Sequence, residues 1–244
     1  MPRRPRIAPG GHVYHVLNRS VGRMNMFRTD KDFAAFHDLL NDAHQRLPTR
    51  LLSWCVMSNH WHFVVWPRRD GELTSFFRWL THTHAMRWRV AHHTVGYGHL
   101  YQGRFKSFPV QRDDHLLTVC RYVERNALSA GLVRHAQDWP WCSLAVRQRG
   151  QPDELSQALC EWPVDRPRNW LQLVNEPMTR KEVDRIELSL SRSRPFGADA
   201  WLVRTVRRLH LQHTLRPEGR PRTTSKDNAA HNGDRAASRF MAQP

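Results

Sequence analysis

Cysteine, acidic residues and long apolar runs are all scarce in this sequence of 244 residues. The four cysteines, Cys55, Cys120, Cys142 and Cys160, include no C-x-x-C pair. This spacing argues against a zinc cage and a disulfide framework, and it indicates small core residues in a reducing compartment. No stretch reaches the ~20 apolar residues of a membrane helix, and no apolar segment follows the basic N-terminus. The sequence therefore predicts a cytoplasmic protein without a membrane anchor.

The shortage of acidic residues leaves a strong excess of positive charge. Lys and Arg number 38 against 22 acidic residues, a formal net charge of +16, and only four of the 38 are lysine. Residues 1–150 hold 22 basic and 10 acidic residues, whereas residues 151–215 hold 10 and 9. Arginine suits phosphate recognition, so we expect a polyanion-binding surface on the first 150 residues, with nucleic acid as the first candidate partner and an anionic membrane as the second.

Apolar periodicity predicts alternating strands and helices along the first 130 residues. The predicted strands cover residues 12–18, 51–57, 61–66 and 104–111, and the predicted helices cover residues 30–47, 72–88 and 113–128. Ser58 and Asn59 separate the second and third strands as a tight hairpin turn. This order predicts an α+β fold in which helices pack on one face of a sheet.

The rest of the chain has a different composition, and we expect three regions. Residues 1–150 form the sheet-containing domain, and residues 151–215 form a small helical C-terminal extension. In this extension, Thr179 and Glu182 form a capping box, and a further helix runs over residues 199–210. Residues 216–244 are polar, with almost no apolar periodicity, and are predicted to be a basic disordered tail.

Two His-x-His pairs occur among the 16 histidines. His60 and His62 lie on a predicted strand, where residues i and i+2 point to the same face, so they can converge on one metal ion. His82 and His84 lie in a predicted helix and diverge too far around its axis to share a metal. The alternative for the first pair is two imidazoles on the wet face of a half-buried strand.

A second pair of polar residues lies on the predicted helix 113–128. Its apolar stripe comprises Leu116, Cys120, Val123 and Ala127. Tyr122 and Asn126 lie together on a flank of this stripe, one turn apart. If the helix packs against the strand of His60 and His62, these side chains would supply a nucleophile and a third metal ligand. The alternative is a tyrosine at the rim of the core and a surface amide.

These residues resemble a known family. The sequence is similar to the single-tyrosine HUH transposases of the IS200/IS605 type, and more closely to REP-associated tyrosine transposases. The matching motifs are His60-Trp-His62, Tyr122-Val-Glu-Arg-Asn126-Ala-Leu-Ser-Ala-Gly-Leu-Val133, Tyr14-His-Val-Leu-Asn-Arg19, Trp54-Cys-Val-Met-Ser-Asn-His-Trp-His-Phe-Val-Val65, Tyr101-Gln-Gly-Arg-Phe-Lys106, Arg194-Pro-Phe-Gly-Ala-Asp-Ala-Trp201 and Leu215-Arg-Pro-Glu-Gly-Arg-Pro-Arg222. Tyr101 and Ala127 depart from the Trp and Pro that are common in the family.

The resemblance implies a fold and a reaction. The fold would be an HUH/ferredoxin-like antiparallel sheet with packed helices, and residues 1–150 would be the HUH single-tyrosine transposase domain. Tyr122 would attack single-stranded DNA beside a hairpin and form a 5′-phosphotyrosine, while His60, His62 and Asn126 would bind a divalent ion. The family implies Mg²⁺ or Mn²⁺, although imidazole ligands favour Zn²⁺, Ni²⁺ or Mn²⁺ over Mg²⁺. The active unit would be a monomer or a homodimer.

Basic residues near the predicted sheet are the candidates for nucleic-acid binding. Arg3, Arg4 and Arg6 precede the first strand, and Arg104 and Lys106 lie at the last one. Contacts from such side chains to phosphates would position a hairpin.

Two other functions remain open. One is a catalytically silent hairpin DNA or RNA binder that keeps the fold, although a silent binder does not need Tyr122, His60, His62 and Asn126. The other is a two-metal nuclease based on carboxylates. Against it, residues 1–150 hold only ten acidic residues, four of which lie on the helix 30–47 as a solvated face: Asp30, Asp32, Asp38 and Asp42.

Overall fold

The computed structural model describes residues 6–150 and 154–216. The chain divides into two units, Met1–Thr214 and Leu215–Pro244, and the elements below belong to the first. The predicted tail at 216–244 lies outside the described residues except for Arg216. Within the described residues, no helix has both the length and the apolar character that crossing a bilayer requires.

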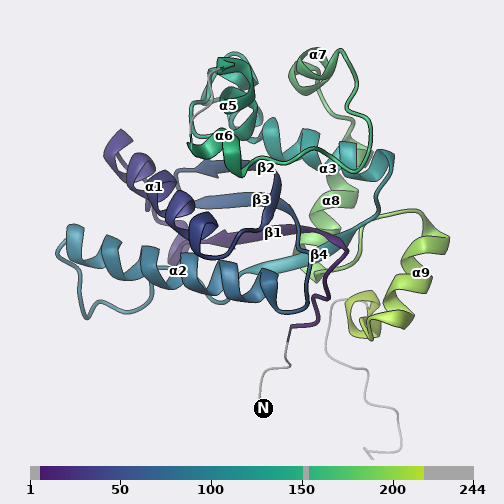
Figure 1. Ribbon diagram of the computed structural model, residues 1–244, viewed down its shortest axis with the longest axis horizontal. Helices are drawn as coiled ribbons and strands as arrows, with labels where there is room; N and C mark the ends of the chain where they lie inside the picture. The colour runs from purple at the N-terminus through teal and green to yellow at the C-terminus, as the bar shows by residue number, and fades with distance from the viewer. Residues whose placement is uncertain (1–5, 151–153, 217–244) are drawn as a thin grey trace, which may run out of the picture. The chain divides into compact units, whose positions relative to one another are not determined.

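A four-stranded antiparallel sheet with the order β2-β3-β1-β4 forms the centre of the first unit (Figure 1). The strands are β1 (Val13–Arg19), β2 (Arg50–Met57), β3 (His60–Trp66) and β4 (Lys106–Val110). Together with two intervening helices they give the βαββαβ order and strand arrangement of a ferredoxin-like fold. The four predicted strands and the turn at Ser58 and Asn59 are confirmed.

Helices α1 (Asp30–Arg46) and α2 (Glu72–Ala91) pack against one face of the sheet. The predicted start of α1 is confirmed, because Thr29 and Asp32 form a capping box there. The apolar residues of α1 and α2 pack with the strand residues Trp61, Phe63 and Val65 in one core. The predicted positions of both helices are confirmed. The prediction was possible because their apolar residues recur with a regular 3.6-residue period over several turns.

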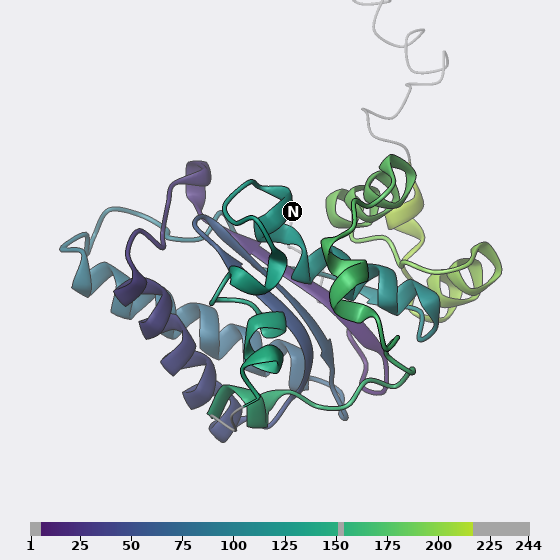
Figure 2. The same ribbon diagram turned by 90° about the horizontal axis from the view of Figure 1, so that it is seen from above.

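The prediction that helices cover only one face of the sheet is wrong. The helix α3 (Asp114–Glu124) packs against β2 and β3 on the opposite face, and Figure 2 shows the sheet between α1 and α2 on one side and the later helices on the other. The reason lies in β2, whose residues from Leu51 to Met57 are all buried. A strand that is apolar on both faces needs cover on both.

The predicted helix 113–128 is interrupted. Helix α3 ends at Glu124, and a separate turn, α4 (Asn126–Ser129), follows after Arg125. The predicted apolar stripe is fully buried, and Gly131 ends the segment with a φ of 71°, as expected for a helix C-terminus. Asn126 therefore stands at the start of α4, one turn beyond Tyr122.

Shorter helices follow α4 along the chain. They are α5 (Ser143–Arg149), α6 (Glu154–Ala158), α7 (Trp170–Asn175), α8 (Arg180–Arg192) and α9 (Asp199–Arg208), and 3₁₀ turns lie at Val21–Arg23, Ala136–Asp138 and Gln212–Leu215. Of these helices, α7 and α8 contribute to the core on the second face of the sheet, whereas α6 contacts α1. The predicted capping box of Thr179 and Glu182 opens α8, and the last predicted helix corresponds to α9. The second core contains Trp170, Val174, Ile186 and Phe196 from the C-terminal extension.

Candidate active site

The two histidines of β3 point to the α3 side of the sheet. Trp61 and Phe63, which alternate with them, belong to the core under α1 and α2. The rings of His60 and His62 have centroids 5.0 Å apart, and His62 is only 2% exposed. The pair is therefore a half-enclosed site rather than the wet strand face that was its alternative.

Each of the two imidazoles has one ring nitrogen engaged by a neighbour. His60 Nδ1 lies 2.6 Å from Asn59 Oδ1, and His62 Nδ1 lies 2.9 Å from His15 Nε2. Both contacts use Nδ1, so Nε2 of each ring remains for the cleft.

Tyr122 and Asn126 meet these histidines, as the helix-flank argument predicts. The Asn126 side chain is close enough to act on both His60 and Tyr122, since it works to raise the pKa of the imidazole and to lower the pKa of the phenol. The Tyr122 ring stands edge-on to His62, with centroids 5.8 Å apart. The structure thus brings all four predicted residues together, from β3 and from the α3–α4 segment.

The environment keeps the imidazoles neutral and the phenol protonated. Burial, with a smaller effect from Arg19, lowers the pKa of His60 to about 4, and burial lowers the pKa of His62 well below its usual 6.5. Burial raises the pKa of Tyr122, and the carboxylate of Glu187 adds to this, whereas Arg19 and the Asn126 hydrogen bond oppose it. Neutral imidazoles have the lone pairs that a cation needs.

The donor set at this position fits one divalent cation. The two imidazoles, whose Nε2 atoms are not engaged by Asn59 or His15, and the amide of Asn126 give three neutral donors of types that Mn²⁺ accepts. Within the described part of the chain, no group of three or more His, Cys, Asp and Glu residues can hold a metal. The amide of Asn126, which acts on the pKa of His60, is the candidate for a third protein ligand.

A cleft of about 690 Å³ opens over the site. Its basic lining comprises Arg19, Arg23, Arg104 and Lys106. Glu187, from α8, is the only acidic residue among the described residues that line it. A cleft of this charge suits an anionic ligand beside Tyr122.

Sequence reasoning missed Arg19 and Glu187. Arg19 pairs with His60 in the β1–β3 register and shares the sheet face of His15 and Leu17. Strand alternation from His15 could have placed it there. No comparable signal exists for Glu187, because α8 reaches the cleft only through the packing of the extension.

The predicted nucleic-acid residues occupy different surroundings. Arg104 and Lys106 line the cleft and also a neighbouring cavity of about 410 Å³, which Arg6 lines as well. The Arg6 guanidinium lies 3.4 Å from the centre of the Phe105 ring and donates to the Phe105 carbonyl. Burial, followed by the charge of Arg104, lowers its pKa to about 10. Arg3 and Arg4 lie outside the described residues.

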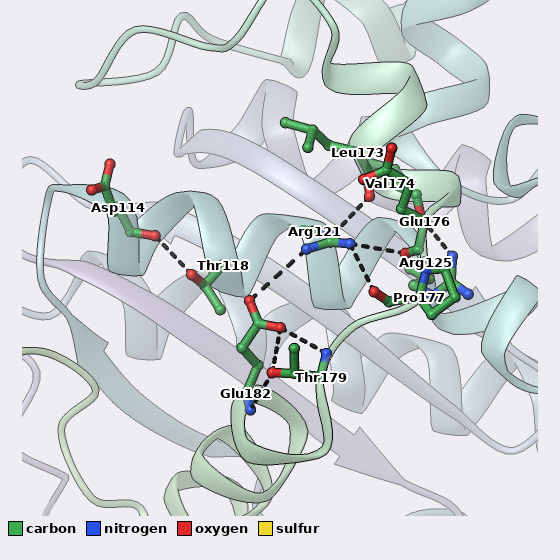
Figure 3. Close-up of polar contacts among 10 residues, drawn as sticks. All are labelled: Asp114, Thr118, Arg121, Arg125, Leu173, Val174, Glu176, Pro177, Thr179 and Glu182. Atoms are coloured by element: carbon green, nitrogen blue, oxygen red, sulfur yellow. Dashed lines mark hydrogen bonds and ion pairs between the residues drawn. The ribbon is translucent and has the colours of Figure 1, made fainter.

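Two arginines of the Tyr122 segment contact the extension instead of the cleft (Figure 3). Arg121 donates to the carbonyl oxygens of Leu173 at 2.6 Å and Glu176 at 2.9 Å. Arg125 donates to those of Val174 at 2.8 Å and Asn175 at 2.6 Å. These bonds satisfy carbonyl groups at the end of α7 and hold the segment that carries Tyr122 in place.

Buried neutral histidines make the fold sensitive to acid. Burial lowers the pKa of His15 and His84 to about 3, and His60 and His62 are lowered as described above. The unfolded chain takes up protons near pH 6.5, and the folded chain does not. We therefore expect the free energy of unfolding to fall as the pH falls from 6.5 to 4.5, by up to ~1.4 kcal/mol per pH unit for each of these histidines.

Urea unfolding at pH 7.0 and pH 5.0 measures this loss. The carboxylates of Asp32 and Glu182 have pKa values below their ordinary 3.8 and 4.5, so the stability they add is lost only at still lower pH. The window between pH 6.5 and 4.5 thus reports on the histidines. Equal unfolding free energies at the two pH values would show that the buried imidazoles take up protons without unfolding.

Comparisons with known proteins give a family match and structural matches at low sequence identity. Residues 10–126 match the family model described as Transposase IS200 like. Among solved structures, a REP-associated tyrosine transposase bound to a REP hairpin is 18% identical, with a TM-score of 0.49, over 63% of this chain and 89% of its own. A Deinococcus radiodurans protein provisionally named as a transposase is 17% identical, with a TM-score of 0.36, over 50% of this chain and 96% of its own. No curated protein matches.

Proposed function

We propose that this chain, which matches the IS200-like transposase family model over residues 10–126, cleaves and rejoins single-stranded DNA with Tyr122 as the nucleophile. The observation that carries this proposal is the meeting of Tyr122 with His60 and His62 in one cleft, where the Tyr122 ring stands edge-on to His62 with ring centroids 5.8 Å apart. A phenol, two imidazoles and an amide in one basic cleft are the groups that phosphodiester transfer needs.

The proposed reaction is the one that the family resemblance implies. The Tyr122 hydroxyl releases its proton to water in the cleft as its oxygen attacks the phosphorus, the bond from phosphorus to the 3′-oxygen breaks, and the departing oxygen takes a proton from water to become a 3′-hydroxyl. The product is a 5′-phosphotyrosine, which conserves the energy of the phosphodiester. The 3′-hydroxyl of another strand can attack it, re-form a phosphodiester and return the tyrosine, so joining needs no nucleotide cofactor.

His60, His62 and Asn126 would hold a divalent cation, Mg²⁺ or Mn²⁺. When bound, such a cation supplies positive charge to the non-bridging oxygens of the scissile phosphate. Because the three protein donors carry no charge, they do not offset it. Arg19, directly opposite His60 on β1, adds a second positive charge on the same side of the cleft and favours the ionised phenol.

The proposed substrate is a single strand beside a hairpin, and it is supported by the basic cleft and by the family resemblance. Arg104 and Lys106 line both the cleft and the neighbouring cavity, so one strand can follow them away from Tyr122. Phosphate contacts of this kind position a strand without reading its sequence.

A labelled DNA strand tests the proposal. The full-length protein is incubated with Mn²⁺ and a pool of single-stranded hairpins with randomised flanks, labelled at either the 5′ or the 3′ end. We expect a denaturation-resistant adduct that carries only the 3′ label, with a free fragment that carries the 5′ label and ends in a 3′-hydroxyl. Hairpin binding without any adduct would favour the silent binder, and an adduct with the 5′ label would contradict a 5′-phosphotyrosine.

Salt dependence tests the charged cleft separately. We expect affinity for the hairpin to fall steeply with salt, and a Lys106→Ala variant to reduce the slope of log Kd against log salt by about 0.7, the value of one phosphate contact on a single strand. Lys31→Ala is the matched control, since Lys31 is an exposed lysine on α1 at the other face of the sheet. Equal slopes for the native chain and the Lys106→Ala variant would place the strand elsewhere.

The carboxylate nuclease receives no support from the site. Among the described lining residues, only Glu187 brings a carboxylate to the cleft. On α1, Asp32 serves in the capping box and contacts His92, and Asp42 pairs with Arg87. These carboxylates make local contacts at α1, and neither of them lines the cleft.

A further inference from the structure

His15 contacts the site from behind the metal-ligand pair. It lies on β1, diagonal to His62 on β3, and its Nε2 is 2.9 Å from His62 Nδ1. The two ring centroids are 5.0 Å apart, and the ring of Phe108 lies 4.9 Å from His15 on β4. Both histidines are fully enclosed, with exposed fractions of 1% and 2%. The hydrogen bond between them is thus shielded from water.

The hydrogen bond permits two arrangements of the hydrogens. If His15 donates, neutral His62 carries its own hydrogen on Nε2, and that nitrogen cannot bind a cation. If His62 donates from Nδ1, its Nε2 faces the cleft with a bare lone pair. Only the second arrangement makes His62 a metal ligand.

The neighbouring ligand already has the second arrangement. Asn59 Nδ2 donates to the Arg23 carbonyl at 3.3 Å, which directs Asn59 Oδ1 toward His60. An amide oxygen can only accept, so His60 carries its hydrogen on Nδ1 and presents Nε2 bare. His15 contacts Nδ1 of His62 in the same way that Asn59 contacts Nδ1 of His60.

We propose that His15 is a positioning residue that accepts the Nδ1 hydrogen of His62 and so presents the bare Nε2 of His62 to the cation. This inference rests on the proposed metal site. The other nitrogen of His15, Nδ1, which carries the hydrogen in this arrangement, is buried and has no hydrogen-bond partner among the described residues. An apolar residue would fill this space beside Phe108 without burying an unpartnered nitrogen, so packing does not account for an imidazole at this position.

Substitution of His15 should weaken metal binding. In a His15→Phe variant the ring packing remains and the acceptor is lost, and we expect the Kd for Mn²⁺, measured by calorimetry on the DNA-free protein, to rise by about 10- to 100-fold. A His15→Gln variant keeps an acceptor, its side-chain oxygen, and should recover part of this affinity. Should His15→Phe fail to fold, His15→Leu, which also lacks an acceptor, takes its place in the comparison.

The matched control is His84→Gln. His84 is another buried histidine with a side-chain partner, since its Nδ1 lies 2.7 Å from the Tyr101 hydroxyl, but it belongs to the core under α1 and α2. It has no contact with the cleft lining, so its substitution should leave the Mn²⁺ affinity unchanged. An equal loss in both variants would show a general effect of unfolding and overturn the proposal.

Nitrogen NMR reads the tautomer directly. In the native chain with Mg²⁺, we expect His62 to carry its hydrogen on Nδ1, and in metal-free His15→Phe we expect a shift toward the Nε2-protonated form. Unchanged Mn²⁺ affinity in a folded His15→Phe variant, or an Nε2 hydrogen on His62 in the Mg²⁺-loaded native chain, overturns the role of His15. If His60→Ala leaves Mn²⁺ binding of the native chain unaltered, the proposed metal site itself fails, which is a distinguishable result.

Discussion

A Tyr122→Phe variant is expected to form no covalent adduct with hairpin DNA while it binds the same DNA with the affinity of the native chain. The substitution removes one oxygen and leaves the ring in its edge-on contact with His62. Without the nucleophile the covalent route is closed, so strand cleavage should fall by roughly 10³-fold or more. Gel analysis of the labelled hairpins under denaturing conditions measures the adduct, and fluorescence anisotropy measures binding.

Another tyrosine provides the control for this experiment. Tyr97 is 78% exposed and does not line the cleft, so Tyr97→Phe should form the adduct at the native rate. An adduct from the Tyr122→Phe variant would assign the nucleophile to another tyrosine, namely Tyr14, Tyr97 or Tyr101. Loss of DNA binding in Tyr122→Phe would show that the hydroxyl supports the structure of the cleft rather than the reaction.

The largest effect on stability is expected from Glu124→Ala. Glu124 is fully buried at the end of α3, where its carboxylate accepts from Ser143 Oγ at 2.6 Å and from Trp170 Nε1 at 2.8 Å. Arg147 Nε lies 4.0 Å away. Removal of the carboxylate leaves these donors buried without their acceptor, and we expect a loss of ~3–5 kcal/mol in the free energy of unfolding, measured with urea.

Glu124 joins three elements, so its loss should also affect the reaction. It ties α3 to α5 through Ser143 and to α7 through Trp170, close to the turn that separates Tyr122 from Asn126. Glu124→Gln keeps the volume and one acceptor and should lose less stability than the alanine variant. Glu161→Ala, an exposed acid in the same extension, should change the unfolding free energy by less than ~0.5 kcal/mol. A loss below about 1 kcal/mol for Glu124→Ala would mean that other contacts hold the Tyr122 segment.

Much of the fold could be predicted because its signals are local. The strands β1 and β3 and the capping box of Thr179 and Glu182 before α8 involve residues within a few positions of each other, and the structure has them where expected. The helix break at Arg125 was not predicted, because the apolar stripe from Leu116 to Ala127 continues across it without a change of period. The packing of helices on the second face of the sheet was not predicted for a related reason. The apolar residues of β2 indicate that both of its faces are buried, but they do not indicate which later helix packs against it.

The candidate site shows the same division. Strand alternation was enough to place His60 and His62 on one face, and helical spacing was enough to place Tyr122 and Asn126 on one flank. Neither rule could show that the two pairs meet. Their meeting depends on the packing of α3 against β2 and β3, which nonlocal apolar contacts decide.

The sequence by itself determined the four strands and the helices α1 and α2, the basic character of the first 150 residues and the side-chain types available for DNA chemistry. Only the tertiary structure decided that the four residues share one cleft, that Glu187 and Arg19 join them, and that His15 contacts His62 from behind. The physical reason is one of range. Backbone geometry and hydrophobic period act over a few residues, whereas a site built from β1, β3, α3 and α8 exists only after cores on both faces of the sheet have packed.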